Sequence, residues 1–296
     1  GRNTGVLADP KVLIYLQHGY PPGSQDQTVP GVWRTYDGWP AQGTWHERLY
    51  LQPDHALSHE AQASGRDELH YLPSTGTDSG IFWWGELQPD QRPVDAHSLV
   101  YDTEPLSHDT AIIGLPHVTL HASASAPLAN WFVRLEDVAP DGRVTLVTGA
   151  ALAGAQRDSM AQPKDLVPGK VYALSLDLHL ASYVFPKGHR IRLAVSNALW
   201  PVAWPTPYPM HTTLELGGEA ASWLDLPRVP LQGRAPPPTL LSPPAPVETR
   251  ADITGEDYAW PGTYRVMRGK NGHTRVVWTG NSDVKYPWGH FHHTEK

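Results

Sequence analysis

The chain of 296 residues contains no cysteine, which excludes disulfide bonds, cysteine-ligated zinc and thiol catalysis. It does not fix the cellular compartment, for which we favour the cytoplasm. Charged residues are also few, at 18%, and the net charge is −7 with no run of Lys or Arg. The basic surface of a nucleic-acid-binding protein is therefore not expected. No apolar stretch approaches the length of about 18 residues that indicates a membrane-spanning helix, so no membrane partner is predicted.

The sequence also lacks the nucleophile elbow G-x-S-x-G, the strand–turn–helix motif that carries the catalytic serine of α/β-hydrolases. Residues 72–76 (LPSTG) come nearest, but Leu72 stands where the first glycine belongs. We therefore expect no catalytic serine in this chain. Residues 1–10 lack methionine and the charged start and apolar run of a signal peptide. We expect a fragment or a processed chain.

Proline and glycine, by contrast, are abundant, with 30 and 26 residues, and both residues break helices and form turns. Between them lie short segments in which apolar and polar residues alternate. Residues 117–122 are one example, in which Val118 and Leu120 are expected to be buried. The clearest example is residues 170–180, whose buried face is predicted to hold Tyr172, Leu174, Leu176, Leu178 and Leu180. This composition and period predict an all-β fold of many short strands.

Two hairpins are predicted from turn residues. In residues 140–143 (PDGR) the proline presets φ and the glycine accepts a positive φ. This turn is expected to join strands at residues 131–138 and 144–147. An Asn-Gly pair predicts a second hairpin, between residues 263–268 and 274–279.

Other stretches give weaker strand signals. Residues 12–17 (VLIYLQ) are an apolar run typical of a buried strand. Residues 20–45 are expected to be irregular. Residues 52–97 are expected to be mostly loop, with residues 69–72 as a candidate extended segment. Residues 150–160 are expected to form a turn or two of helix, which Gly154 weakens.

Sixteen histidines invite a search for metal ligands. His290, His292 and His293 cluster, and imidazoles two residues apart on a strand could share a metal. No second pair or carboxylate has matching spacing apart from Glu295, so surface histidines are expected, with no metal and no cofactor. His189 is expected to make a hydrogen bond at the start of a strand rather than to catalyse.

Twelve tryptophans and twelve tyrosines outnumber four phenylalanines. Both residue types are amphipathic and favour interfaces and stacking surfaces. Three interpretations stay open: a carbohydrate-binding face, packing against a catalytic domain, and ordinary core and loop anchors. The groups in the sequence are Trp33, Trp39 and Trp45, then Phe82, Trp83 and Trp84, then Trp200 and Trp204.

Three strand-like segments carry a resemblance. They are residues 98–106 (SLVYDTEPL), 131–143 (WFVRLEDVAPDGR) and 184–195 (VFPKGHRIRLAV). Asp90-Gln91-Arg92-Pro93 precedes the first, and a W-R…W-P loop follows residues 12–17. In this order, over roughly residues 10–217, they resemble the C-terminal, non-catalytic domain of X-Pro dipeptidyl-peptidase and cocaine-esterase-like serine hydrolases.

The resemblance implies a jelly-roll β-sandwich of the galactose-binding-domain-like type with extra C-terminal strands. We expect the sandwich over residues 1–227, a proline-rich linker over 228–246, and a C-terminal extension packing on the sandwich over 247–296. It also implies an upstream α/β-hydrolase domain in the same polypeptide that carries Ser, Asp and His, so no catalytic residue falls in this chain. Homo-oligomers through this domain are left open.

The function that the resemblance implies is support of the hydrolase domain and a share in shaping its substrate pocket. Phe82, Trp83 and Trp84, which lie before the 98–106 strand, are the candidates for the pocket wall, with loop packing as the alternative. A stand-alone carbohydrate- or ligand-binding module is the other function considered, and an assembly module is a third. The substrate, peptide or ester, is left open.

Overall fold

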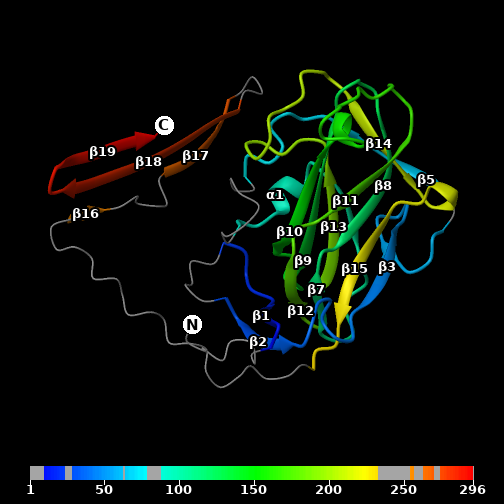
Figure 1. Cartoon of the computed structure of the whole chain (residues 1–296). Coiled ribbons are helices and arrows are strands. Elements are labelled where there is room, and N and C mark those ends of the chain that lie inside the picture. The colour runs from blue at the N-terminus through cyan, green and yellow to red at the C-terminus, as the bar shows by residue number, and fades with distance from the viewer. Residues whose placement is uncertain are drawn as a thin grey trace. The chain divides into compact units, whose positions relative to one another are not determined.

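The computed structural model describes residues 10–23, 29–62, 64–78, 88–232, 254–256, 263–269 and 274–295. The chain divides into two compact units, Gly1–Pro237 and Pro238–Lys296. Strands dominate both, as Figure 1 shows, and the described residues contain only one α-helix, α1 (Arg92–Asp95). None of the helical segments in this described part is long and apolar enough to cross a membrane. The all-β prediction is confirmed.

Most strands of the first unit form one large sheet, here called sheet A. Its main path has the order β2–β1–β12–β7–β15–β8–β14–β5, while β11 pairs with β8, and β3 pairs with β15 and β4. The strands are β1 (Val12–His18), β2 (Gly31–Tyr36), β3 (Trp45–Leu51), β4 (Leu57–Ser58), β5 (Gly65–His70), β7 (Thr110–Gly114), β8 (His117–Ala124), β11 (Tyr172–Asp177), β12 (Ala181–Phe185), β14 (His211–Leu216) and β15 (Trp223–Val229).

The remaining strands of this unit form a second sheet, here called sheet B, in the order β10–β9–β13–β6. Figure 1 shows β9, β10 and β13 side by side. Apolar side chains from the facing sides of both sheets form one core, which makes the unit a β-sandwich. The strands of sheet B are β6 (Leu99–Asp102), β9 (Asn130–Val138), β10 (Val144–Ala153) and β13 (Arg190–Ser196).

The core follows the alternation in the sequence. Val118 and Leu120 are fully buried, and Leu174 on the neighbouring strand is too. Burying each such side chain contributes about 1.5–3 kcal/mol. The prediction for Leu180 is wrong, because it is 55% exposed. The ladder of β11 with β8 ends at Asp177, so Leu180 is no longer held to the buried face.

The PDGR hairpin is confirmed, because β9 and β10 are antiparallel neighbours and Gly142 in the turn has a φ of 85°. The helix expected over residues 150–160 is wrong in its first part. There β10 continues to Ala153, and a single 3₁₀ turn, Gly154–Gln156, follows. Pairing of Ala150 with Val133 gives the alanine-rich segment ladder hydrogen bonds, which outweigh its helix propensity.

Two stretches expected to be irregular contain strands. Residues 20–45 include β2, which pairs with β1 over its whole length. Residues 52–97 include β4 and β5, and β5 pairs with β14. The sequence of β5 (GRDELH) is polar, and its side chains alternate between half-buried and exposed. A strand with so little apolar content gives no alternation to detect.

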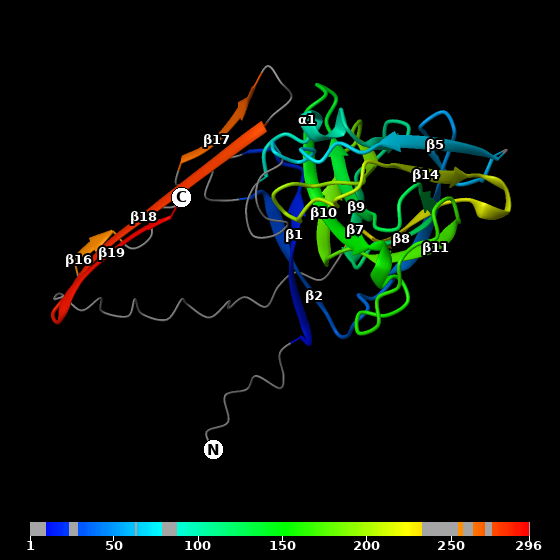
Figure 2. The ribbon, with the colours of Figure 1, turned by 90° about the horizontal axis from the view of Figure 1, so that it is seen from above.

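The β1–β2 ribbon adds a second apolar layer to sheet A, and Figure 2 shows the two strands side by side. Leu16 packs with Ile113 and Val184 in a cluster separate from the main core. Since Ile112 belongs to the main core and neighbouring strand residues face opposite ways, this cluster covers the outer face of sheet A. The ribbon therefore leaves its own outer face, which includes Leu13, toward solvent.

The second unit is a small antiparallel sheet in the order β16–β18–β17, with β19 also paired to β18. The predicted tail hairpin is confirmed, since β17 pairs with the first part of β18. The boundaries 227/228 and 246/247 stay a prediction, although β15 continues past residue 227. The strands are β16 (Thr254–Glu256), β17 (Thr263–Arg268), β18 (Thr274–Tyr286) and β19 (Gly289–Glu295).

A buried charge cluster holds the α1 segment on the outer face of sheet B. Arg134, only 1% exposed, donates to Asp95 Oδ1 of α1 at 2.9 Å and to Gln91 Oε1 at 3.0 Å. Arg192 on the next strand donates to Asp95 Oδ2 at 2.8 Å and to both oxygens of Asp102 at 2.7 Å. Every charge in this group has a partner of opposite sign, as burial of charge requires.

Glu136 is the remaining ionisable group of this cluster. It is fully buried, and neither of its oxygens accepts a hydrogen bond. Burial raises the pKa of this carboxyl well above its usual range, and the nearby Asp95 raises it further. Arg134 opposes the shift, since its Nη1 lies 2.9 Å from Glu136 Oε1. Two arginines and two aspartates already balance one another, so an ionised Glu136 would be an uncompensated charge. Burial therefore favours the protonated form of this carboxyl in the folded chain.

Glu136→Gln should stabilise the chain, and the gain should grow with pH. In the unfolded chain Glu titrates near 4.3, so below about pH 4 both variants are neutral and similarly stable. As pH rises, the unfolded chain loses the Glu136 proton while the folded chain keeps it, which lowers the free energy of unfolding. The glutamine variant does not titrate at this position and keeps its stability. Urea unfolding at pH 4 and pH 8 should show a gain at pH 8 only, of about 1.4 kcal/mol for each unit by which the pKa in the folded chain exceeds that in the unfolded chain.

Glu219→Gln is the control, because Glu219 is exposed, and it should change stability little at either pH. A Glu136→Gln variant that is destabilised at pH 8 would show that Glu136 is ionised and paired with Arg134.

Candidate functional site

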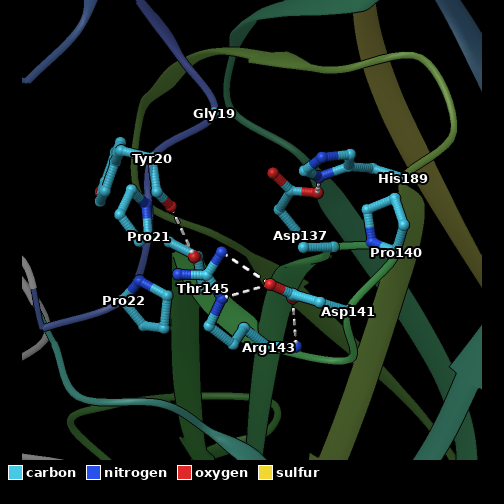
Figure 3. A pocket seen from close by; sticks show the side chains of 11 residues that line it. Gly19, Tyr20, Pro21, Pro22, Asp137, Pro140, Asp141, Arg143, Thr145 and His189 are labelled. Carbon is cyan, nitrogen blue, oxygen red and sulfur yellow. Dashed lines mark hydrogen bonds and ion pairs between the residues drawn. The ribbon is translucent and has the colours of Figure 1, made fainter.

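A pocket of about 310 Å³ lies where the ends of several strands meet, as Figure 3 shows. The loop after β1 forms one side, the β9–β10 turn forms another, and the residue before β13 completes it. Both sheets thus contribute to the pocket. Its lining residues are Gly19, Tyr20, Pro21, Pro22, Asp137, Ala139, Pro140, Asp141, Arg143, Thr145 and His189.

Asp137 is the buried polar group of the pocket, with an exposed fraction of 2%. Its Oδ2 accepts a hydrogen bond from the Tyr183 hydroxyl at 2.8 Å, and its Oδ1 lies 2.8 Å from His189 Nδ1. Burial raises the pKa of the Asp137 carboxyl, and its bonds with Tyr183 and His189 oppose the shift. The prediction that His189 makes a hydrogen bond at a strand start is confirmed.

The bond to Asp137 also sets the imidazole tautomer. A carboxylate needs a donor, so Nδ1 carries the proton. The other ring nitrogen, Nε2, makes no hydrogen bond to another residue in the described ranges. His189 therefore presents one unused nitrogen from a ring whose orientation is fixed by a buried carboxylate.

The rim of the pocket carries a guanidinium that is held by a carboxylate. Arg143 Nε and Nη2 both lie 2.7 Å from Asp141 Oδ2, and the Arg143 backbone N–H donates to Asp141 Oδ1 at 3.1 Å. These bonds lower the pKa of the Asp141 carboxyl. Thr145 Oγ1 donates to the Tyr20 carbonyl at 2.8 Å, which ties the start of β10 to the loop after β1.

The predicted pocket-wall residues Phe82, Trp83 and Trp84 lie outside the described residues, so their role stays a prediction. Gln88 is the first described residue after them, and its carbonyl accepts a hydrogen bond from the Gly23 N–H at 2.7 Å. This bond fixes Gln88 next to the chain segment that lines the pocket.

The structure brings together a serine, a histidine and an aspartate that share no motif in the sequence. On the outer face of β8 and β11, His117 Nδ1 lies 2.7 Å from Asp177 Oδ1, and His117 Nε2 lies 3.4 Å from Ser175 Oγ. Strand pairing explains the contact, because Asp177 is opposite His117 in the antiparallel register.

The same geometry argues against hydrolysis at this place. The Asp177 side chain is 74% exposed, so water screens its effect on the imidazole. Thr119 Oγ1 lies at the same 3.4 Å from His117 Nε2 and competes with Ser175. Ser175 also sits on a regular strand rather than on the strand-to-helix turn that exposes a hydrolase nucleophile.

The tail histidines lie on β19 opposite Asp283 of β18. His290 Nε2 contacts the Asp283 carboxylate, and His292 Nδ1 is 3.5 Å from its Oδ2. Among the residues that the structure describes, no three His, Asp or Glu side chains are grouped to hold a metal ion.

The aromatic groups lie at several places on the first unit. Trp33, Trp39 and Trp45 are 37%, 51% and 47% exposed, so they are not core anchors. Trp33 is in β2, not in an irregular loop, and contacts the Tyr15 ring at 5.2 Å. Trp204 is 81% exposed and meets Trp200 edge to face at 5.1 Å.

The first unit is similar to a family of hydrolase domains. Residues 4–230 match the model of the X-Pro dipeptidyl-peptidase C-terminal non-catalytic domain. The β-sandwich is thus a non-catalytic hydrolase domain, and the chain belongs to this family.

The relatives are longer proteins. A Mycobacterium bovis protein described as a candidate serine esterase is 30% identical over 224 residues, which are 67% of this chain and 34% of that protein. The cocaine esterase of a Rhodococcus species is 28% identical over 187 residues, 57% of this chain and 32% of the enzyme. The chain spans about a third of the length of these relatives.

Solved structures agree. An aminopeptidase from a marine-sediment Thaumarchaeota archaeon has a TM-score of 0.59 and 25% identity, covering 67% of this chain and 39% of that chain. An α-amino acid ester hydrolase has a TM-score of 0.55 and 26% identity, covering 66% and 39%.

The chain of residues 1–296 should hydrolyse p-nitrophenyl acetate no faster than its Ser175→Ala variant. The reason is that Ser175 lacks a strained turn, and His117 is oriented by an exposed carboxylate. Initial rates at pH 8 at equal protein concentration make the comparison, and circular dichroism confirms that both variants are folded. A rate that falls at least about tenfold on substitution would instead identify Ser175 as a nucleophile.

Proposed function

We propose that this chain is the supporting C-terminal module of a serine hydrolase that cleaves acyl ester or peptide bonds. The module packs against an α/β-hydrolase domain that precedes it in the same polypeptide and helps to shape the substrate pocket. Membership of the non-catalytic family carries the proposal. The length of the relatives supports it, since about two thirds of each lies beyond the match, and their names describe ester or peptide hydrolysis.

The outer face of the β1–β2 ribbon is the surface that we assign to the hydrolase domain. Leu13 and Trp33 lie on it and are 41% and 37% exposed, and Trp39 follows β2 at 51%. Tyr15 shares the face, because it is opposite Trp33 in the ribbon. Clustered apolar side chains of this size on one face are typical of an interaction surface. The inner face already packs on sheet A, so the ribbon is anchored while its outer face is available.

Phe82, Trp83 and Trp84 follow β5 and precede α1 in the sequence, and we assign them to the wall of the hydrolase pocket. Large aromatic side chains are suited to contact a substrate. The buried Arg134–Asp95 pair fixes α1, the element that follows these residues.

The complete coding frame tests the proposal first, and it should encode a G-x-S-x-G elbow ahead of residue 1. In the purified complete polypeptide, Leu13→Ser/Trp33→Ser should lower the activity on p-nitrophenyl butyrate by at least about tenfold and lower the melting temperature. The physical reason is the loss of apolar contact between domains, at about 25 cal/mol per Å² of buried area. The same pair of substitutions in the chain of residues 1–296 should change stability little.

Trp204→Ser is the matched control, since this tryptophan is more exposed and lies outside the ribbon. It should leave both activity and melting temperature unchanged. A complete frame without the elbow contradicts the proposal. So does a ribbon variant whose activity and melting temperature equal those of the control.

A further inference from the structure

In the pocket of Figure 3, the carboxylate oxygens have hydrogen-bond partners, while some nitrogen atoms have none among the described residues. Both oxygens of Asp137 are occupied, one by Tyr183 and one by His189. Both oxygens of Asp141 are occupied by Arg143. Every oxygen of the two carboxylates thus already has a partner, and the carboxylates hold His189 and Arg143 in place.

The unused capacity consists of nitrogen groups on those same residues. Arg143 uses Nε and Nη2 for Asp141, which leaves Nη1 without a partner among the described residues. His189 uses Nδ1 and leaves Nε2. A guanidinium N–H is a strong donor to an oxyanion. With its proton on Nδ1, His189 presents Nε2 as an acceptor. Arg143 lines the pocket from the β9–β10 turn, and His189 lines it from the residue before β13.

The rest of the wall is largely apolar. Pro21, Pro22, Ala139 and Pro140 contribute only carbon side chains, and Tyr20 adds a ring. A volume of about 310 Å³ is at the lower end of the range of about 300–1,000 Å³ seen for small-molecule sites. These features suit a compact ligand with one oxyanion and one apolar part.

We propose that this pocket binds a small monocarboxylic acid, whose carboxylate accepts a hydrogen bond from Arg143 Nη1 and whose apolar part contacts the prolines. This site is within the non-catalytic module. The inference does not rest on the proposed supporting role, because the chain of residues 1–296 is sufficient to test it. Asp141 offsets part of the Arg143 charge, so the affinity is expected to be modest, at about millimolar Kd.

The probe is benzoate, and benzamide is its neutral counterpart of nearly the same shape. In ¹H–¹⁵N spectra of the chain of residues 1–296 at pH 6.5, benzoate should cause saturable shifts of the amide signals of Gly142, Arg143 and His189. Benzamide should bind at least about tenfold more weakly, since it offers no oxyanion to the Arg143 guanidinium.

Arg143→Gln should weaken benzoate at least about tenfold, since it removes the charged donor. Arg48→Gln is the matched control. Arg48 is 47% exposed against 48% for Arg143, and it too is paired with an aspartate, Asp225, on β15. The control should bind benzoate like the unchanged chain. The spectra themselves report whether each variant is folded.

Four results would overturn the inference. The first is the absence of saturable shifts up to about 50 mM benzoate, a concentration well above the expected Kd. The second is that benzamide binds as tightly as benzoate. The third is that Arg143→Gln leaves benzoate binding unchanged, and the fourth is that Arg48→Gln weakens it equally. Trialanine, a peptide with a free carboxyl terminus, separates the two sources of a carboxylate. Tighter binding of trialanine than of benzoate would replace the small acid by a chain terminus.

Discussion

The salt bridge between Arg134 and Asp95 is the contact on which the arrangement of the first unit depends. Both groups are buried, so neither can be left without the other. Asp95 also accepts from Arg192, which in turn holds Asp102 of β6. One helix of four residues is thereby fixed to three strands of sheet B. The segment that leads into β6 cannot shift its register without leaving a buried charge unpaired, which costs about 3–5 kcal/mol.

In the pocket at the strand ends, a buried carboxylate likewise needs partners. Asp137 is buried with the inner side chains of β9, and Tyr183 and His189 are the partners that make its burial tolerable. A requirement of stability has thus fixed the orientation of an imidazole at a surface opening. Function in a non-catalytic module can arise in this way, because groups held rigidly for folding are already organised for a ligand.

Much of the fold could be predicted from the sequence, because alternation and turn residues act locally. Val118, Leu120 and the PDGR hairpin are examples. Only the end of the polar strand β5 overlaps a predicted extended segment, because β5 is stabilised by pairing with β14 rather than by its own pattern. The hydrogen bond of His189 was predicted, but its partner Asp137 lies 52 positions away in the sequence, and only the pairing of β13 with β9 brings the two together. The contact of Ser175 with His117 arises similarly from the pairing of β11 with β8.

We propose that the outer face of the β1–β2 ribbon contacts a hydrolase domain. Amide hydrogen exchange of residues 31–36 tests it most directly, because β2 has only β1 as a strand partner among the described residues. The comparison is between the chain of residues 1–296 and the complete polypeptide. The account predicts that exchange of these amides slows at least about tenfold in the complete polypeptide, while exchange of β5 at the other end of sheet A is unchanged. Equal exchange of residues 31–36 in both would contradict it.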